Sequence, residues 1–244
     1  MELTAALEAR DGLVCVVGAG GKKSTMYALA DRLDRAVVTA TVRIPIFDDH
    51  VADVRVTGDP LAALEAVGDD DWPLGLVPEQ EREDRYRGYD PETVDAIAAA
   101  DPVGTTLVKA DGARVREFTA PGEREPQLPA TTDVVVPIAS TQVVGQPLTD
   151  EVVHRPERVA ALTGLDIGDD IRPEDVGTVL SSPDGGLKDV PEGATAIPLL
   201  NKVDDAEWEG IAREIAATIH ERAAVPRVVL TSLIADAPLV DVVE

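Results

Sequence analysis

The segment Leu13–Thr25 reads Leu-Val-Cys-Val-Val-Gly-Ala-Gly-Gly-Lys-Lys-Ser-Thr, and it decides the fold. Its first five residues form a continuous apolar run that predicts a buried strand, and its polar end opens a helix-forming segment. Glycines between a strand and a helix let the backbone curl, so that several N–H groups and the positive end of the helix point at phosphate oxygens. Lys22 would reach the β- and γ-phosphates of a nucleoside triphosphate. The alternative is a tight strand-to-helix turn that binds no ligand.

The glycine loop departs from the pattern G-x-x-x-x-G-K-[ST] at two points. Its leading glycine, Gly18, stands four residues before Lys22, and this shorter spacing is similar to the loops of Mur ligases and of some dimeric P-loop ATPases. The position after Lys22, where Ser or Thr normally holds magnesium, is Lys23. Either Ser24 or Thr25 takes over that role, or metal binding is weak. The residues that we expect to bind the nucleotide here are Gly18, Ala19, Gly20, Gly21, Lys22, Lys23, Ser24 and Thr25.

Apolar runs of strand length recur along the chain and alternate with helix-forming segments. The expected strands are Leu13–Val17, Ala36–Ala40, Thr105–Ala110, Val134–Ile138, Ala196–Leu200 and Arg227–Leu230. The expected helices are Lys23–Leu33, Pro91–Ala100, Arg155–Thr163 and Ala206–Ala223. Continuous apolar runs are typical of strands covered on both faces, so the pattern predicts one three-layer, P-loop NTPase-like α/β domain over residues 1–244, with a mostly parallel sheet flanked by helices. Three segments are expected to be loops, namely Asp69–Asp90, Glu117–Pro129 and Gly164–Gly193.

Asp111 follows the expected strand Thr105–Ala110 and is itself followed by Gly112. A carboxylate at the end of a buried strand beside a phosphate loop is a usual way to hold magnesium through water. We therefore expect Ser24 and Asp111 to place the metal, and Lys22 and Asp111 to be the catalytic residues. The alternative is that Asp-Gly is only a turn.

The segment Leu199–Asp204 contains Asn201-Lys202-Val203-Asp204, which matches the N-K-x-D pattern by which GTPases read guanine. The Asp204 carboxylate would accept two N–H bonds from the base, an arrangement that adenine cannot supply, while Asn201 and Lys202 would support the base and the loop. A further strand ends in Thr231-Ser232-Leu233, where GTPases place a second loop that contacts the base. A strand end followed by an Asp that caps a helix is the alternative.

The composition is strongly acidic, with 46 Asp and Glu residues against 22 Lys and Arg, only five of which are lysines, and a formal net charge of −24. Such a chain repels itself at low salt, so we expect a cytoplasmic protein of a salt-accumulating, halophilic organism. This charge excludes a broad nucleic-acid surface. The single cysteine, Cys15, excludes a disulfide within the chain and is expected to be buried. No signal peptide or membrane span is expected.

Several motifs occur together in a fixed order along most of the chain, from about Leu13 to Ser232. They are Gly-Ala-Gly-Gly-Lys at Gly18–Lys22, the Thr-x-Thr…Ile-Pro run at Thr39–Pro45, Ala-Asp-Gly-Ala at Ala110–Ala113, Ala-Pro…Glu-Pro at Ala120–Pro126, Gly-Gln-Pro-Leu at Gly145–Leu148, His-Arg-Pro-Glu at His154–Glu157 and Asn-Lys-Val-Asp at Asn201–Asp204. This succession resembles the YqeC family, described as accessory proteins for selenium-dependent molybdenum hydroxylases.

The resemblance implies a P-loop protein that acts in maturation of a selenium-containing molybdenum cofactor. Three positions depart from the family's tendencies. Lys109 stands where the family tends to have an acidic residue, Lys23 where it tends to have Thr, and Arg43 where it tends to have His. These changes bear on hydrolysis more than on binding.

The leading hypothesis is a nucleotide-dependent accessory enzyme or chaperone. It would bind GTP or ATP with Mg²⁺ and couple hydrolysis or phosphoryl transfer to the handling of a molybdenum hydroxylase or its cofactor intermediate. The loop Glu117–Pro129 is the expected contact for the substrate or partner. A nucleotide-binding regulatory module without turnover, which Lys23 favours, and a Mur-type ATP-dependent ligase, which the loop spacing favours, are the alternatives.

Overall fold

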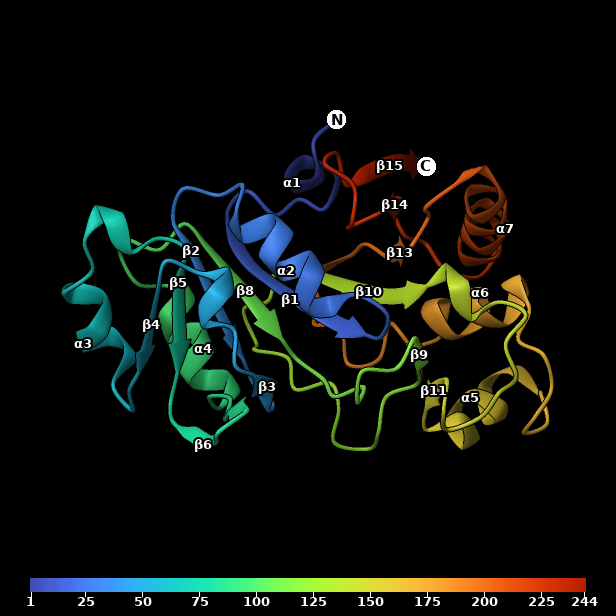
Figure 1. Ribbon diagram of the computed structural model, residues 1–244, viewed down its shortest axis with the longest axis horizontal. Coiled ribbons are helices and arrows are strands. Elements are labelled where there is room, and N and C mark those ends of the chain that lie inside the picture. Colours follow the sequence, from blue (N-terminus) through green and yellow to red (C-terminus); the bar gives the residue numbers. More distant parts are fainter.

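The computed structural model describes residues 1–244, and its centre is a large sheet with helices on both faces (Figure 1). The strands lie in the order β15 (Leu239–Val243), β14 (Val228–Thr231), β13 (Leu199–Asn201), β10 (Val134–Ser140), β1 (Gly12–Gly18), β8 (Thr105–Lys109), β2 (Ala36–Ala40), β5 (Leu74–Val77) and β4 (Asp53–Val56). The short strand β12 (Thr195–Ala196) also pairs with β10. All neighbours are parallel except β14 and β15. The predicted fold class is confirmed.

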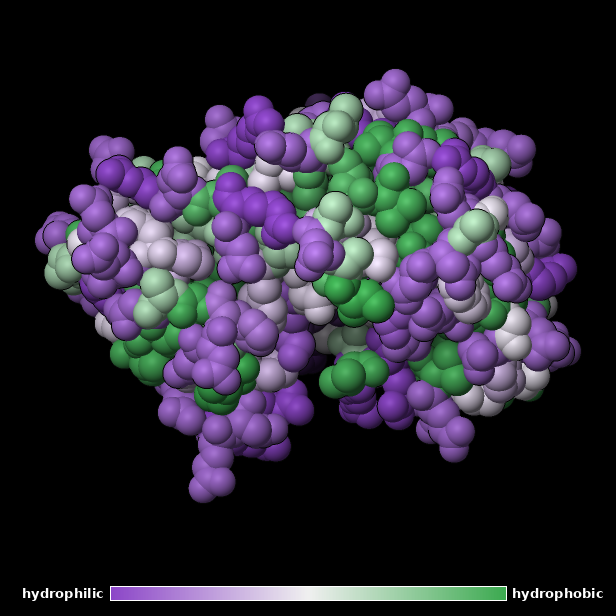
Figure 2. Space-filling view, turned by 45° about the horizontal axis from the view of Figure 1, so that its top comes forward, coloured by the Kyte–Doolittle hydropathy of each residue, from purple (hydrophilic) through white to green (hydrophobic).

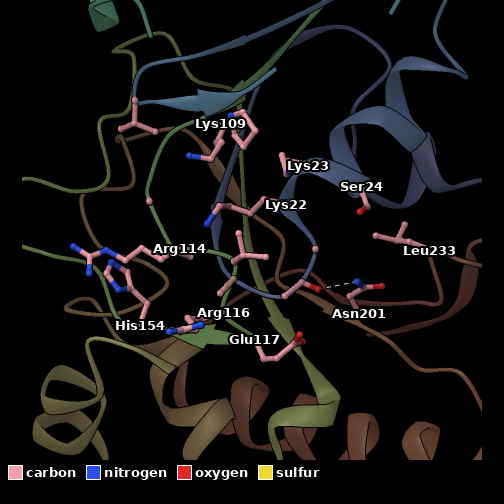
Figure 3. A pocket seen from close by; sticks show the side chains of 18 of the residues that line it. Lys22, Lys23, Ser24, Lys109, Arg114, Arg116, Glu117, His154, Asn201 and Leu233 are labelled. Carbon is pink, nitrogen blue, oxygen red and sulfur yellow. Dashed lines mark hydrogen bonds between the residues drawn. The ribbon is translucent and has the colours of Figure 1, made fainter. Parts of the chain in front are cut away.

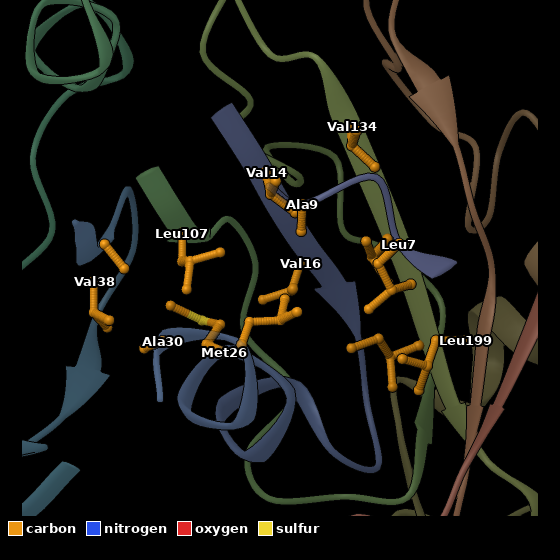
Figure 4. Packing of buried hydrophobic residues seen from close by; sticks show 14 of the residues in the cluster. Leu7, Ala9, Val14, Val16, Met26, Ala30, Val38, Leu107, Val134 and Leu199 are labelled. Atoms are coloured by element: carbon orange, nitrogen blue, oxygen red, sulfur yellow. The ribbon is translucent and has the colours of Figure 1, made fainter. Parts of the chain in front are cut away.

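Both faces of β1 are covered, which explains its continuous apolar run. Val14 and Val16 face α2 (Lys22–Ala30), where they meet Met26, Leu29 and Ala30 (Figure 4). The alternate residues Leu13, Cys15 and Val17 face the layer that contains α3 (Pro60–Glu65) and α4 (Pro91–Ala98). Each fully buried Val or Leu side chain stabilises the fold by about 1.5–3 kcal/mol. The sheet therefore holds β1, and the loop that follows it, rigidly.

Three further helices cover the other end of the second face, namely α5 (Pro156–Thr163), α6 (Pro173–Ser181) and α7 (Ala206–Arg222). Asp205 caps the N-terminus of α7, because its carboxylate accepts hydrogen bonds from the N–H groups of Glu207 and Trp208 at 2.9 and 3.0 Å. This cap places the preceding segment Asn201–Asp204 at a fixed point between β13 and α7.

The remaining elements are short. They are the helix α1 (Leu3–Ala6), the single 3-10 turns η1 (Asp48–His50), η2 (Asp69–Asp71) and η3 (Thr141–Val143), the pair β9 (Phe118–Thr119) and β11 (Val153–His154), and the three-stranded sheet of β3 (Ile44–Pro45), β7 (Arg85–Tyr86) and β6 (Gln80–Arg82). No helix combines the length and the apolarity that crossing a bilayer requires.

The order of the strands places a crevice at one edge of the sheet. After β1 the chain skips one position to form β2, and after β8 it returns across β1 to form β10. The carboxyl ends of β1, β8 and β10 therefore meet where the connections diverge, which is where open α/β sheets bind ligands.

Several expected boundaries are wrong for identifiable reasons. The predicted strand Ala196–Leu200 is interrupted between β12 and β13 because Pro198 has no N–H to donate to a neighbour. The expected loop Asp69–Asp90 contains the fully buried β5 as well as β6 and β7. The apolar run Leu74–Val77 indicates β5, but it is short and lies among Pro and acidic residues that are typical of loops.

The expected loop Gly164–Gly193 contains the helix α6, whose pattern is broken by Gly177. A Cβ at Gly177 would meet Thr218 of α7 at 2.6 Å, so this glycine lets the two helices approach closely. The expected loop Glu117–Pro129 is irregular apart from β9, as predicted.

Cys15 is fully buried, and burial raises the pKa of its thiol to about 12, so the thiol stays protonated. The expectation of a buried structural cysteine is confirmed.

Hydrophilic residues dominate the surface (Figure 2), and the formal charge of −24 makes this surface repel itself. We predict that the melting temperature in about 2 M KCl is higher than in about 0.1 M KCl, because salt screens repulsion between exposed carboxylates. Each kcal/mol added to the free energy of unfolding should raise the melting temperature by about 2–4 °C. Differential scanning calorimetry measures the effect, and a melting temperature that stays level or falls between the two concentrations contradicts the prediction.

Candidate functional site

A cleft of about 1100 Å³ opens at the carboxyl ends of the central strands. Nine basic side chains line it, namely Lys22, Lys23, Arg43, Arg85, Lys109, Arg114, Arg116, Arg155 and Lys202. Only three carboxylates, those of Glu117, Glu125 and Asp204, do so. Four of the five lysines in the chain are therefore gathered at one cleft of a molecule with a net charge of −24. This distribution of charge favours an anionic ligand.

The glycine loop forms part of the cleft wall with its main chain. The Gly21 N–H has no acceptor, and the N–H groups of Lys22, Lys23 and Ser24 form the unpaired first turn of α2. All four residues line the cleft. Gly18 and Gly20 take φ values of +89° and +82°, where a Cβ would collide with the backbone of β10. The glycines thus permit the bend that turns the free amides toward the cleft.

Two segments distant in sequence hold this bend in place. The Gly18 N–H donates to Asp111 Oδ2 at 2.6 Å, and the Gly20 N–H donates to the Arg116 carbonyl at 3.1 Å. On the other side, Asn201 Nδ2 donates to the Gly20 carbonyl at 2.8 Å (Figure 3). The predicted loop, Asp111 and Asn201 are therefore brought together.

Lys22 folds back onto its own loop. Its ammonium lies 2.7 Å from Asp111 Oδ1, in an ion pair without hydrogen-bond geometry, and donates a short hydrogen bond to the Gly18 carbonyl. Both side chains of the ion pair are buried. Phosphates entering the cleft would draw the ammonium away from Asp111.

Not every predicted residue lies on the cleft wall. Ala19, Gly20, Gly21, Lys22, Lys23, Ser24, Asn201, Lys202 and Asp204 do. Gly18 and Asp111 lie behind the loop and shape it. Thr25 is fully buried, and its hydroxyl donates to the Gly21 carbonyl at 3.1 Å, so it is not brought to the cleft.

Lys109 is a site residue that the sequence indicated only as a departure from the family. Its ammonium donates to the carbonyls of Asp111 and Arg43 at 2.6 and 3.0 Å and contacts no carboxylate. Burial, and next the charge of Lys22, lower the pKa of Lys109 from 10.5 to about 7; Lys23 adds to this, and Asp111 and Glu125 oppose it. The available signal was a basic residue at the end of a predicted buried strand.

Asp204 is exposed and lines the cleft. Its Oδ1 accepts a hydrogen bond from the Ser232 hydroxyl at 2.6 Å, and its Oδ2 accepts one from Gln142 Nε2 at 3.0 Å. Lys202 pairs with Glu117 at 2.7 Å. Gln142 was not expected here, because nothing near it in the sequence indicates a partner 62 residues away.

Arg114, His154 and Arg155 also line the cleft. Burial, and then the charges of Arg155 and Arg114, lower the pKa of His154. Arg155 pairs with Glu125 at 2.6 Å, and Glu125 Oε1 accepts the Gly112 N–H at 3.1 Å. The expected contact loop Glu117–Pro129 therefore borders the cleft.

The expected magnesium residues Ser24 and Asp111 do not fit a divalent ion in this arrangement, because Lys22 is paired with Asp111. No group of three or more His, Cys, Asp or Glu side chains is placed to hold a metal ion. Asp111 Oδ1, a buried atom without a hydrogen bond, is the one feature that suits a cation, but Lys22 already neutralises it. Ser24 lies on the side of the cleft that holds Asn201 and Leu233 (Figure 3), and Lys23 stands where the loop hydroxyl normally binds the ion. A divalent ion here would meet three ammonium groups.

Lys109 gives the folding equilibrium a pH dependence with a defined sign. Between about pH 7 and its unfolded pKa of 10.5, the unfolded chain holds one proton more at Lys109 than the folded chain, so stability rises with pH by up to about 1.4 kcal/mol per unit. We predict that Lys109→Met removes this slope. Urea unfolding of both proteins from about pH 6 to 9 measures it. A difference between the two proteins that stays constant with pH is incompatible with the lowered pKa.

Comparison with known proteins agrees with the order of motifs along the chain. The family model described as YqeC protein matches residues 14–157, a range that includes the glycine loop, Asp111 and His154. The Escherichia coli (strain K12) protein named Uncharacterized protein YqeC is 27% identical over 202 residues, which cover 81% of this chain and 78% of that protein. The chain belongs to the YqeC family.

Proposed function

We propose that this protein binds a nucleoside triphosphate in the cleft, with the phosphates on the glycine loop and guanine as the preferred base. One observation carries the proposal. Unpaired main-chain amides of Gly21–Ser24 open onto a cleft lined by nine basic side chains in a strongly acidic molecule. Backbone N–H groups at a helix N-terminus are a common binding site for phosphate.

The arrangement of the cleft sets the direction of the nucleotide. Lys22 lies between two groups of side chains, with Asn201 and Leu233 on one side and Lys109 and Arg114 on the other (Figure 3). Because the loop lysine contacts the β- and γ-phosphates, the base extends toward Asn201 and the terminal phosphate points toward Lys109.

The base preference follows from Asp204. Its carboxylate already accepts two hydrogen bonds, from Ser232 and Gln142, so its two oxygens are oriented by the fold. Guanine offers two adjacent N–H donors that would replace or share these bonds, whereas adenine does not offer this pair. A guanine preference also argues against the Mur-type ligase, which only the loop spacing favours.

The cleft could serve an enzyme that turns the nucleotide over or a regulator that only binds it. Hydrolysis or phosphoryl transfer would use Lys22 to stabilise charge on the transferred phosphoryl group and Asp111 to position Lys22 and the loop. Lys23, which stands where the loop hydroxyl normally binds Mg²⁺, favours the alternative, a nucleotide-binding regulator without turnover. Phosphate release under saturating nucleotide distinguishes them, because a regulator releases none.

The biological role that we propose comes from the family resemblance. The protein would serve the maturation of a selenium-dependent molybdenum hydroxylase or its cofactor, with the loop Glu117–Pro129 as the contact. The test is the selenium content of the hydroxylase purified from cells with and without this gene, measured by mass spectrometry. Equal selenium content in the two preparations would contradict the role.

We predict that Lys22→Ala weakens binding of GTP by about 10–100-fold, because one charge-assisted contact to the phosphates is lost. Isothermal titration calorimetry in molar KCl measures the dissociation constant. Arg32→Ala is the matched control, since Arg32 is exposed and bonds only to the Ala28 carbonyl. Unchanged affinity in Lys22→Ala would remove the loop from the proposed site.

We predict that Asp204→Ala reduces the preference for GTP over ATP by about 1–3 kcal/mol, with little change in ATP affinity, because the bond to guanine is lost. Asp236→Ala removes the same charge from the neighbouring exposed loop and should leave the preference intact. Equal losses for both nucleotides would show that Asp204 does not read the base.

A further inference from the structure

We propose that the cleft takes up the metal-free nucleoside triphosphate, with the ammonium groups of Lys23 and Lys109 supplying the positive charge that Mg²⁺ supplies in other P-loop proteins. This inference rests on the proposed nucleotide binding and names the charge state of the ligand. It concerns Lys23, which stands where the loop hydroxyl normally binds Mg²⁺, and Lys109, which lines the same cleft.

Lys23 occupies the position where the loop hydroxyl normally binds Mg²⁺. It is the second residue of α2, it lines the cleft, and it makes no ion pair within the protein. Its main-chain N–H belongs to the unpaired first turn of α2, so main chain and side chain both offer positive charge to a phosphate.

Lys109 is held in place from behind. The carbonyls of Asp111 and Arg43 fix its ammonium at 2.6 and 3.0 Å, and its side chain is 7% exposed. Carbonyl dipoles orient a buried ammonium but do not cancel its charge, so a buried Lys without a carboxylate is costly. Its ammonium contacts two carbonyls and no anion within the protein. A terminal phosphate beside Lys109 would supply the anion.

Lys22, Lys23 and Lys109 all line the cleft (Figure 3). Lys22 and Lys23 are both close enough to Lys109 to lower its pKa. Two carboxylates lie near this group. Asp111 accepts the Gly18 N–H at Oδ2 and is paired with Lys22 at Oδ1, and Glu125 is paired with Arg155 and accepts the Gly112 N–H. A fully ionised triphosphate would be attracted by each ammonium group, whereas a divalent cation placed among them would be repelled by each.

The inference predicts which ligand species binds. Calorimetric titration of the wild-type protein with GTP, in excess Mg²⁺ and in EDTA at the same ionic strength, should give dissociation constants within about threefold of each other, or tighter binding in EDTA. A dissociation constant in EDTA at least about tenfold higher would overturn the inference and leave nucleotide binding standing. Absence of binding in both buffers would remove the proposed function and this inference with it.

A variant tests the role of Lys23 directly. Lys23→Ser restores the usual loop hydroxyl at a partly exposed helix position, so folding should be preserved. We expect its dissociation constant in EDTA to rise by about tenfold and the rise in Mg²⁺ to be smaller. Arg32→Ala, a control outside the cleft, should have the same ratio of the dissociation constant in EDTA to that in Mg²⁺ as the wild type. If the dissociation constant in EDTA divided by that in Mg²⁺ is the same for Lys23→Ser as for the wild type, the role assigned to Lys23 is contradicted.

Discussion

The carboxylate of Asp111 joins the two central strands to the glycine loop, and the shape of the site depends on it. One oxygen accepts the Gly18 N–H and the other faces the ammonium of Lys22. Burying this ion pair costs desolvation energy, so its value lies less in stability than in position. Without it, Gly18 would lose its partner and the amides of Gly21–Ser24 would lose their common direction. Asn201 completes the fixation from the opposite side through the Gly20 carbonyl.

The distribution of charge makes this loop stand out from the rest of the molecule. A surface with an excess of carboxylates attracts cations and repels anions, but the cleft gathers nine basic side chains and four of the five lysines. In concentrated salt the long-range repulsion of an anionic ligand is screened, whereas contacts inside the cleft are shielded much less. The same salt that stabilises the acidic surface therefore lets a polyphosphate reach the cationic cleft.

The sequence predicted those parts of the fold that depend on local pattern. The strands β1 and β2 and the helix α4 follow from continuous or periodic apolar residues, and the glycine loop follows from its place between a strand and a helix. The sequence did not predict features that depend on distant partners. Gly177 disguised α6 because its function is the close approach of α7, and Gln142 reaches Asp204 only after β10 and β13 are paired. Lys109 was visible in the sequence, but its burial and its position beside Lys22 required the sheet.

The central claim is that main-chain amides of the glycine loop hold the phosphates of a nucleotide. A crystal structure of the protein grown with GTP tests it most directly. The account predicts phosphate oxygens within hydrogen-bond distance of the N–H groups of Gly21, Lys22, Lys23 and Ser24, with the Lys22 ammonium turned from Asp111 toward them. A nucleotide bound elsewhere, or a loop whose amides face no phosphate, would contradict it.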